Sequence, residues 1–170
     1  MKKEIPFKNY VILALIFGLT VLAVFYMRSW YNTYKEYYTQ NSVMTQIIME
    51  IKSDELANYS LENQSFILYV ASGQNTELKE FEDEFKDLVK DMELTNKMLY
   101  LNLDEVDSSS FYATLKSDFA ADSSVQSQID TSSSASMYLF ASGEITNVLN
   151  NVDSYSLGRL ETIINRWDIV

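Results

Sequence analysis

The aspartates and glutamates are the residues in this sequence whose side chains could carry out chemistry. The 170-residue chain has 24 aspartates and glutamates against 13 lysines and arginines, for a formal net charge of −11, and it has neither histidine nor cysteine. Without those two residue types a thiol nucleophile, a disulfide, a thiolate or imidazole metal site and a histidine-based triad are all excluded. Acid–base catalysis by a pair of carboxylates is not excluded by this composition.

The acids form two groups. The first lies in one amphipathic stretch and comprises Glu77, Glu80, Glu82, Asp83 and Glu84; the second comprises Asp104, Glu105 and Asp107. A hydrolase needs two acids from different elements that converge in a cleft with separated pKa values, whereas neighbouring acids on an amphipathic helix are typical of a solvated face. Asp104 and Asp107 also lack the spacing and the glycine of an EF-hand loop. We therefore expect no enzyme activity, no metal and no cofactor; a buried pair of convergent acids would be the alternative.

The elements that position these residues begin with an apolar run from Tyr10 to Met27, which carries no charge. Its 18 residues would span about 27 Å as a helix, close to the roughly 30 Å hydrocarbon core of a bilayer. Aromatic residues, which favour membrane interfaces, flank it: Phe7, Tyr10, Tyr26, Trp30 and Tyr31. A cleaved signal peptide is disfavoured because bulky side chains stand where small ones are required. The run is predicted to be a transmembrane helix whose partner is the lipid bilayer.

Basic residues near this run predict its orientation. Lys2, Lys3 and Lys8 precede it, whereas only Arg28 and Lys35 follow closely, so residues 1–9 are expected in the cytoplasm and everything after residue 27 outside. The protein is thus predicted to be a single-pass protein of the cell membrane. Residues 28–170 contain 10 basic and 23 acidic residues, a net charge of −13, which argues against nucleic acid as a partner.

Beyond the membrane run, apolar residues recur at three- and four-residue steps up to Ile51, with no proline or glycine to interrupt them. This pattern predicts a helical stalk over residues 28–52, loosened around residues 39–42. Its tyrosine-rich stripe is either a surface for a partner or one that rests on the membrane interface or on the chain's own domain.

From residue 53 the pattern changes to that of an α/β domain. Continuous apolar runs predict strands at residues 66–71, 98–103, 137–141 and 144–149, the last two joined by a turn at Ser142-Gly143. Helical spacing predicts helices at residues 78–92 and 157–167 and a short one around residues 111–119. Serine-rich residues 120–136 are interpreted as a mobile connection.

This order of elements resembles the thioredoxin family. Residues 65–70, SFILYV, are similar to the central strand before the family's redox motif, residues 139–144, LFASGE, are similar to its hairpin, and residues 51–64 are similar to its lead-in of a strand and a short helix. The resemblance covers roughly residues 47–170. It implies a three-layer fold with a central four-stranded mixed sheet. The nearest subgroup is the bacterial membrane-anchored thioredoxin-like accessory proteins that accompany bacteriocin or peptide export.

The departures from the family lie at its redox site. The two positions of the family's C-x-x-C motif are held here by Gln74 and Glu77 or by Asn75 and Leu78, depending on the alignment, and Ala135 stands at the spacing of the family's cis-proline. The resemblance therefore implies a scaffold without thiol–disulfide chemistry. Its degenerate redox-site face is the expected binding surface, made of Gln74, Asn75, Thr76, Glu77 and Ala135.

These observations predict a non-catalytic thioredoxin-like binding or accessory module on the extracytoplasmic face, whose partner is a membrane or secreted protein. The alternative is a pilin-like or secretion-apparatus subunit that assembles through its N-terminal helix. Against that alternative, no glycine-bounded leader site precedes the apolar run and no glutamate lies just inside it.

Overall fold

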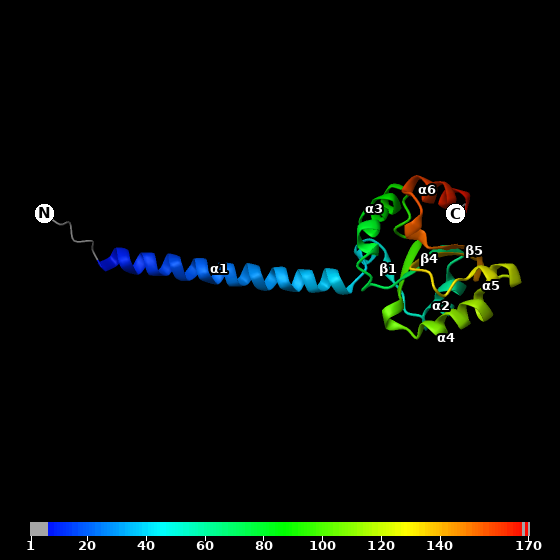
Figure 1. Cartoon of the computed structure of the whole chain (residues 1–170), viewed down its shortest axis with the longest axis horizontal. Helices are drawn as coiled ribbons and strands as arrows, with labels where there is room; N and C mark the ends of the chain where they lie inside the picture. The colour runs from blue at the N-terminus through cyan, green and yellow to red at the C-terminus, as the bar shows by residue number, and fades with distance from the viewer. Residues whose placement is uncertain (1–6, 168, 170) are drawn as a thin grey trace. The chain divides into compact units, whose positions relative to one another are not determined.

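The computed structural model describes residues 7–167 and residue 169, without the side chains of residues 36 and 38–40. These residues form two compact units, one ending at Tyr38 and one beginning at Thr39. The first unit is one helix, and the second is an α/β domain with helices on both faces of a sheet (Figure 1).

Helix α1 (Phe7–Gln40) contains the predicted membrane run. Its segment Phe7–Lys35 is long and apolar enough to cross a membrane, and the most apolar part is not buried against the protein. Leucine and alanine favour helix, and no proline follows Pro6. Length and composition thus make α1 a candidate membrane span.

The predicted stalk was wrong beyond residue 40. Ser42 caps a short 3₁₀ helix, η1 (Val43–Gln46), which leads into β1 (Met49–Glu50). Met44, Ile48 and Ile51 are buried in the domain core. Their helical spacing therefore reflects burial in the domain core and not a continuous α-helix.

The sheet has five strands in the order β1-β3-β2-β4-β5, so the prediction of four strands missed the two-residue edge strand β1. β1 and β2 (Ser65–Ala71) each run parallel to β3 (Met98–Asn102), whereas β4 (Ala135–Ala141) is antiparallel to both β2 and β5 (Glu144–Asn150). The Ser142-Gly143 turn joins β4 to β5 with both residues at positive φ, 54° and 87°, as the hairpin prediction requires.

Helices cover both faces of this sheet (Figure 1). α3 (Leu78–Asp91) and α6 (Leu157–Arg166) pack on one face, against side chains such as Ile67 and Tyr69. The opposite face, with Phe66 and Leu68, packs against α2 (Leu56–Glu62), α4 (Ser108–Thr114), the π-helix η3 (Leu115–Phe119) and α5 (Ser123–Gln128). Two short 3₁₀ helices, η2 (Leu103–Glu105) and η4 (Val152–Ser154), complete the domain. Alternate residues of the central strands thus fill two cores, as expected of strands covered on both faces.

The serine-rich connection is more ordered than predicted. It contains α5, whose Val125 is buried, followed by the buried Ile129. Asp122 caps α5 by accepting hydrogen bonds from the backbone N–H groups of Ser124 and Val125, at 2.7 and 2.9 Å. Two apolar anchors and one cap thus contribute to the order of a segment in which seven of 17 residues are serine.

Candidate functional site

The loop between β2 and α3, residues 72–77, occupies the place of the family's redox motif. It is held by the side chains of Asn102, the last residue of β3, and of Asp104 on η2. Asp104 accepts hydrogen bonds from Ser72 Oγ at 2.7 Å and from the Gln74 backbone N–H at 2.9 Å. Asn102 Oδ1 accepts from the Gly73 N–H at 3.1 Å. The loop is therefore fixed through its backbone and Ser72, which leaves most of its other side chains available.

Four of the five predicted face residues lie in this loop. Gln74, Thr76 and Glu77 are exposed, whereas Asn75 is half-buried and its Oδ1 accepts a hydrogen bond from the Glu77 N–H at 3.1 Å. The exposed side chains offer an amide, a hydroxyl and a carboxylate. These groups can form hydrogen bonds with a partner, and none of them is a strong nucleophile.

Ala135, the fifth predicted residue, pairs with Ala71 at the same edge of the sheet as the loop. Its side chain is fully buried among core residues. Ala135 thus lies at the expected place but contributes no side chain to the surface. Within residues 7–167 no peptide bond is cis.

Behind the loop lies a buried carboxylate that the sequence pattern did not predict. Glu82 on α3 is only 1% exposed. Its carboxylate oxygens lie 2.8 and 2.9 Å from Ser42 Oγ and accept hydrogen bonds from the Val43 N–H at 2.8 Å and from the Tyr69 hydroxyl at 3.0 Å. The carboxylate therefore binds the start of η1 to α3 and to the central strand.

The expectation that the acids of α3 form a solvated face is thus wrong for Glu82, although Glu77, Glu80 and Glu84 are exposed. A signal was present, because Glu82 stands four residues after Leu78 and three before Phe85, on the apolar stripe of the helix. A charged residue on such a stripe must find partners from another element. The sequence does not reveal that Ser42 and Val43 supply them.

Lys79 adds a cation to the same region. It is buried, and its Nζ donates hydrogen bonds to the carbonyls of Gly73, at 3.0 Å, and Asn41, at 2.6 Å. It connects the redox-site loop with the residues that precede η1. Tyr100, on the neighbouring strand, donates its hydroxyl to the Ala71 carbonyl at 3.1 Å.

Burial is the main cause of the pKa shifts of the Glu82, Tyr69 and Lys79 side chains. It raises the pKa of the Glu82 carboxyl, although the hydrogen bonds from Ser42, Val43 and Tyr69 oppose the shift. It also raises the pKa of the Tyr69 hydroxyl well above its usual range, with the charge of Glu82 as a further cause. Burial lowers the pKa of Lys79, and the charge of Glu82 opposes that change. The groups are linked to one another and closed to solvent, an arrangement suited to holding chain segments together.

Two of the three acids in the second group, Asp104 and Asp107, accept hydrogen bonds within the protein. Asp104 holds the loop, and Asp107 caps α4 by accepting a hydrogen bond from the Ser109 N–H at 3.2 Å. In the part of the chain that the structure describes, no three acidic side chains gather as a metal site would require.

No protein-family model and no curated protein matches the sequence. Several solved thioredoxins are similar to the structure. Mitochondrial thioredoxin 3 of Saccharomyces cerevisiae is 12% identical with a TM-score of 0.49, over 74% of this chain and 99% of that one. Chlamydomonas reinhardtii thioredoxin f2 is 11% identical with a TM-score of 0.48, over 71% and 96%. Plasmodium falciparum thioredoxin is 15% identical with a TM-score of 0.47, over 70% and 98%.

The order and directions of the strands are those of a thioredoxin-like fold, with a mixed five-stranded sheet between helices. An N-terminal helix that is a candidate membrane span precedes it. A shared fold does not carry an activity, and this chain has no cysteine with which to perform the reaction of a thioredoxin.

Proposed function

We propose that the protein is a membrane-anchored, non-catalytic thioredoxin-like module that presents a binding surface on the extracytoplasmic face. One observation carries the proposal: the loop at the redox position is held by Asn102 and Asp104, while the side chains that it exposes have no redox chemistry. An ordered loop with exposed amide, hydroxyl and carboxylate groups suits recognition because little ordering entropy remains to be lost on binding.

In this proposal the membrane anchor keeps the domain close to its partner. A helix in the bilayer confines the domain to the membrane surface and raises its effective concentration for neighbouring proteins. The partner is a membrane or secreted protein. The resemblance to accessory proteins of bacteriocin or peptide export suggests that this partner belongs to an export system.

Site-specific photocrosslinking in native membranes tests the proposal. A benzophenone amino acid placed at Gln74 or Thr76 should give a discrete adduct with a membrane or secreted protein, because both side chains are exposed in the loop. The matched control is Asn96, which is exposed just before β3 and therefore lies at the opposite edge of the sheet from the loop.

Adducts of equal yield from all three positions, or none from the loop, would contradict the binding role. A disulfide reductase or isomerase activity of the purified chain would contradict its non-catalytic character.

A further inference from the structure

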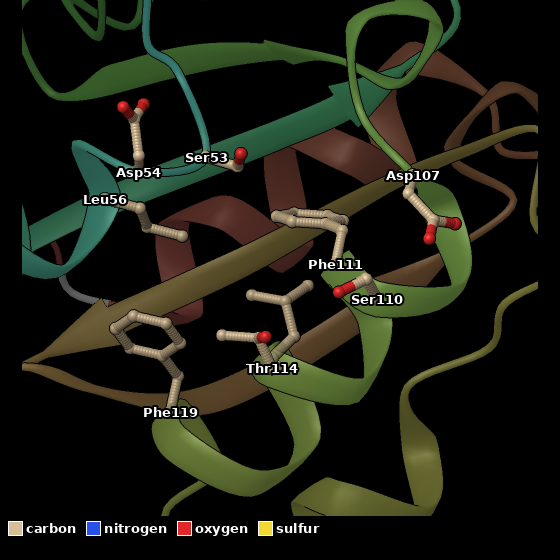
Figure 2. A pocket seen from close by; sticks show the side chains of 9 residues that line it. Ser53, Asp54, Leu56, Asp107, Ser110, Phe111, Thr114 and Phe119 are labelled. Atoms are coloured by element: carbon tan, nitrogen blue, oxygen red, sulfur yellow. The ribbon is translucent and has the colours of Figure 1, made fainter.

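A hollow of about 230 Å³ opens on the face of the sheet opposite α3, between the segment that enters α2 and the α4–η3 helix (Figure 2). Small-molecule sites typically measure roughly 300–1,000 Å³, so this one suits a single large side chain better than a cofactor. We call it the α2–α4 pocket. It is lined by Ser53, Asp54, Leu56, Asp107, Ser110, Phe111, Thr114, Leu115 and Phe119.

The floor of the α2–α4 pocket is apolar. Leu56, Phe111, Leu115 and Phe119 are core residues with at most 7% exposure, and the pocket reaches them from the surface. Leu115 and Phe119 begin and end the π-helix η3, a distortion that is frequently found at functional sites. An apolar group entering here would leave water for an existing apolar surface, which is favourable.

The rim of the pocket is acidic. Asp54, from the α2 side, and Asp107, from the start of α4, are both exposed and stand on opposite sides of the aromatic floor (Figure 2). No lysine or arginine lines the pocket; the nearest in sequence, Lys52 and Lys116, lie outside its lining. The charged side chains that line the pocket, Asp54 and Asp107, are therefore both negative.

We propose that the α2–α4 pocket binds a basic peptide segment of a partner protein, which inserts one large apolar side chain and places flanking lysines or arginines beside the carboxylates of the rim. The floor recognises the inserted side chain by burial, and the rim selects positive charge and disfavours acidic segments. This surface is distinct from the redox-site loop, so the inference goes beyond the proposed function.

The test uses the full chain in phosphatidylcholine nanodiscs and the labelled peptide acetyl-Lys-Lys-Phe-Lys-Lys-amide, with fluorescence polarisation as the readout and empty nanodiscs as the blank. We expect saturable binding that weakens as salt is added. A peptide with alanine in place of phenylalanine, and one with glutamates in place of the lysines, should each bind at least about tenfold more weakly, because each lacks one of the two recognised groups.

Two pairs of variants locate the binding. Ser110 is exposed and lines the opening, so Ser110→Leu should fill the pocket and weaken binding at least about tenfold, whereas Ser109→Leu, its exposed neighbour outside the lining, should change binding by less than about twofold. Asp54→Asn should weaken binding about two- to fivefold at low salt, and Asp91→Asn, at an exposed position at the end of α3, should leave it unchanged.

Equal binding by Ser110→Leu and Ser109→Leu would overturn the proposal, as would equal affinity for the phenylalanine and alanine peptides. Circular dichroism of each variant confirms that a loss of binding is not a loss of folding. These outcomes do not depend on crosslinking from the redox-site loop, so a failure here is distinguishable from a failure of the proposed function.

Discussion

At the scale of single residues, Glu82 connects three segments of the domain: the start of η1, α3 and β2. Its carboxylate accepts hydrogen bonds from Ser42, Val43 and Tyr69, and the side chain is buried. Because burial raises its pKa in the folded protein, the folded state holds this proton more tightly than the unfolded chain, whose reference pKa is 4.5. The stability that protonation contributes is present in full below that reference value and is lost as pH rises through the folded-state pKa.

The Glu82→Gln variant tests whether protonation of Glu82 stabilises the folded protein. The amide keeps the shape of the side chain and one acceptor oxygen but does not titrate. We expect the free energy of unfolding of the native protein, relative to the variant, to increase as the pH is lowered from about 7 toward about 5. Urea unfolding of the full chain in detergent, followed by near-ultraviolet circular dichroism, measures the difference. A difference that is constant over this range, or that shrinks on acidification, would show that Glu82 is not held as described.

At the scale of elements, the sequence predicted secondary structure best where the apolar pattern is uninterrupted or clearly periodic. The strand at residues 66–71 and the helix at residues 78–92 match β2 and α3 closely, because an uninterrupted apolar run and a sharp helical stripe each have few alternatives. β1 was missed because it has only two residues and both are exposed. The stalk was extended too far because the spacing of Met44, Ile48 and Ile51 imitates a helix.

The candidate site, too, could be predicted from the sequence only in part. The position of the redox-site loop followed from the strand before it and the helix after it. Glu82 was misjudged because its partners Ser42 and Val43 lie about 40 residues away in the chain. The α2–α4 pocket could not be found from the sequence at all, since Leu56 and Phe119 meet only through the tertiary fold.

The serine-rich segment makes a prediction at this scale. Ile129 directly follows α5, is 2% exposed and packs in the core. Ile129→Ala should lower the free energy of unfolding by about 2–4 kcal/mol, because it removes buried methyl groups and leaves a cavity. Thr131→Ala, two residues on and exposed, should change it by less than about 0.5 kcal/mol. A cost for Ile129→Ala as small as that of the control would mean that the segment is a mobile connection after all.

At the scale of the whole molecule, the two units differ in character. One is an apolar helix with an unburied surface, and the other is an acidic domain with two cores of its own. Residues 28–170 carry a net charge of −13 from 10 basic and 23 acidic residues, whereas lysines prevail before the apolar run. Basic residues that flank a span tend to stay in the cytoplasm during insertion, so the proposed orientation follows from Lys2, Lys3 and Lys8 before the run against Arg28 and Lys35 after it.

Labelling of single cysteines in intact bacterial cells tests the central claim most directly, because the chain has no cysteine of its own to interfere. Lys2→Cys places a thiol before the apolar run, and Glu161→Cys places one on the exposed side of α6. With a maleimide that cannot cross membranes, we expect Glu161→Cys to be labelled in intact cells and Lys2→Cys only after permeabilisation. Labelling of Lys2→Cys in intact cells, with Glu161→Cys protected until the membrane is opened, would contradict a binding module displayed outside the cell.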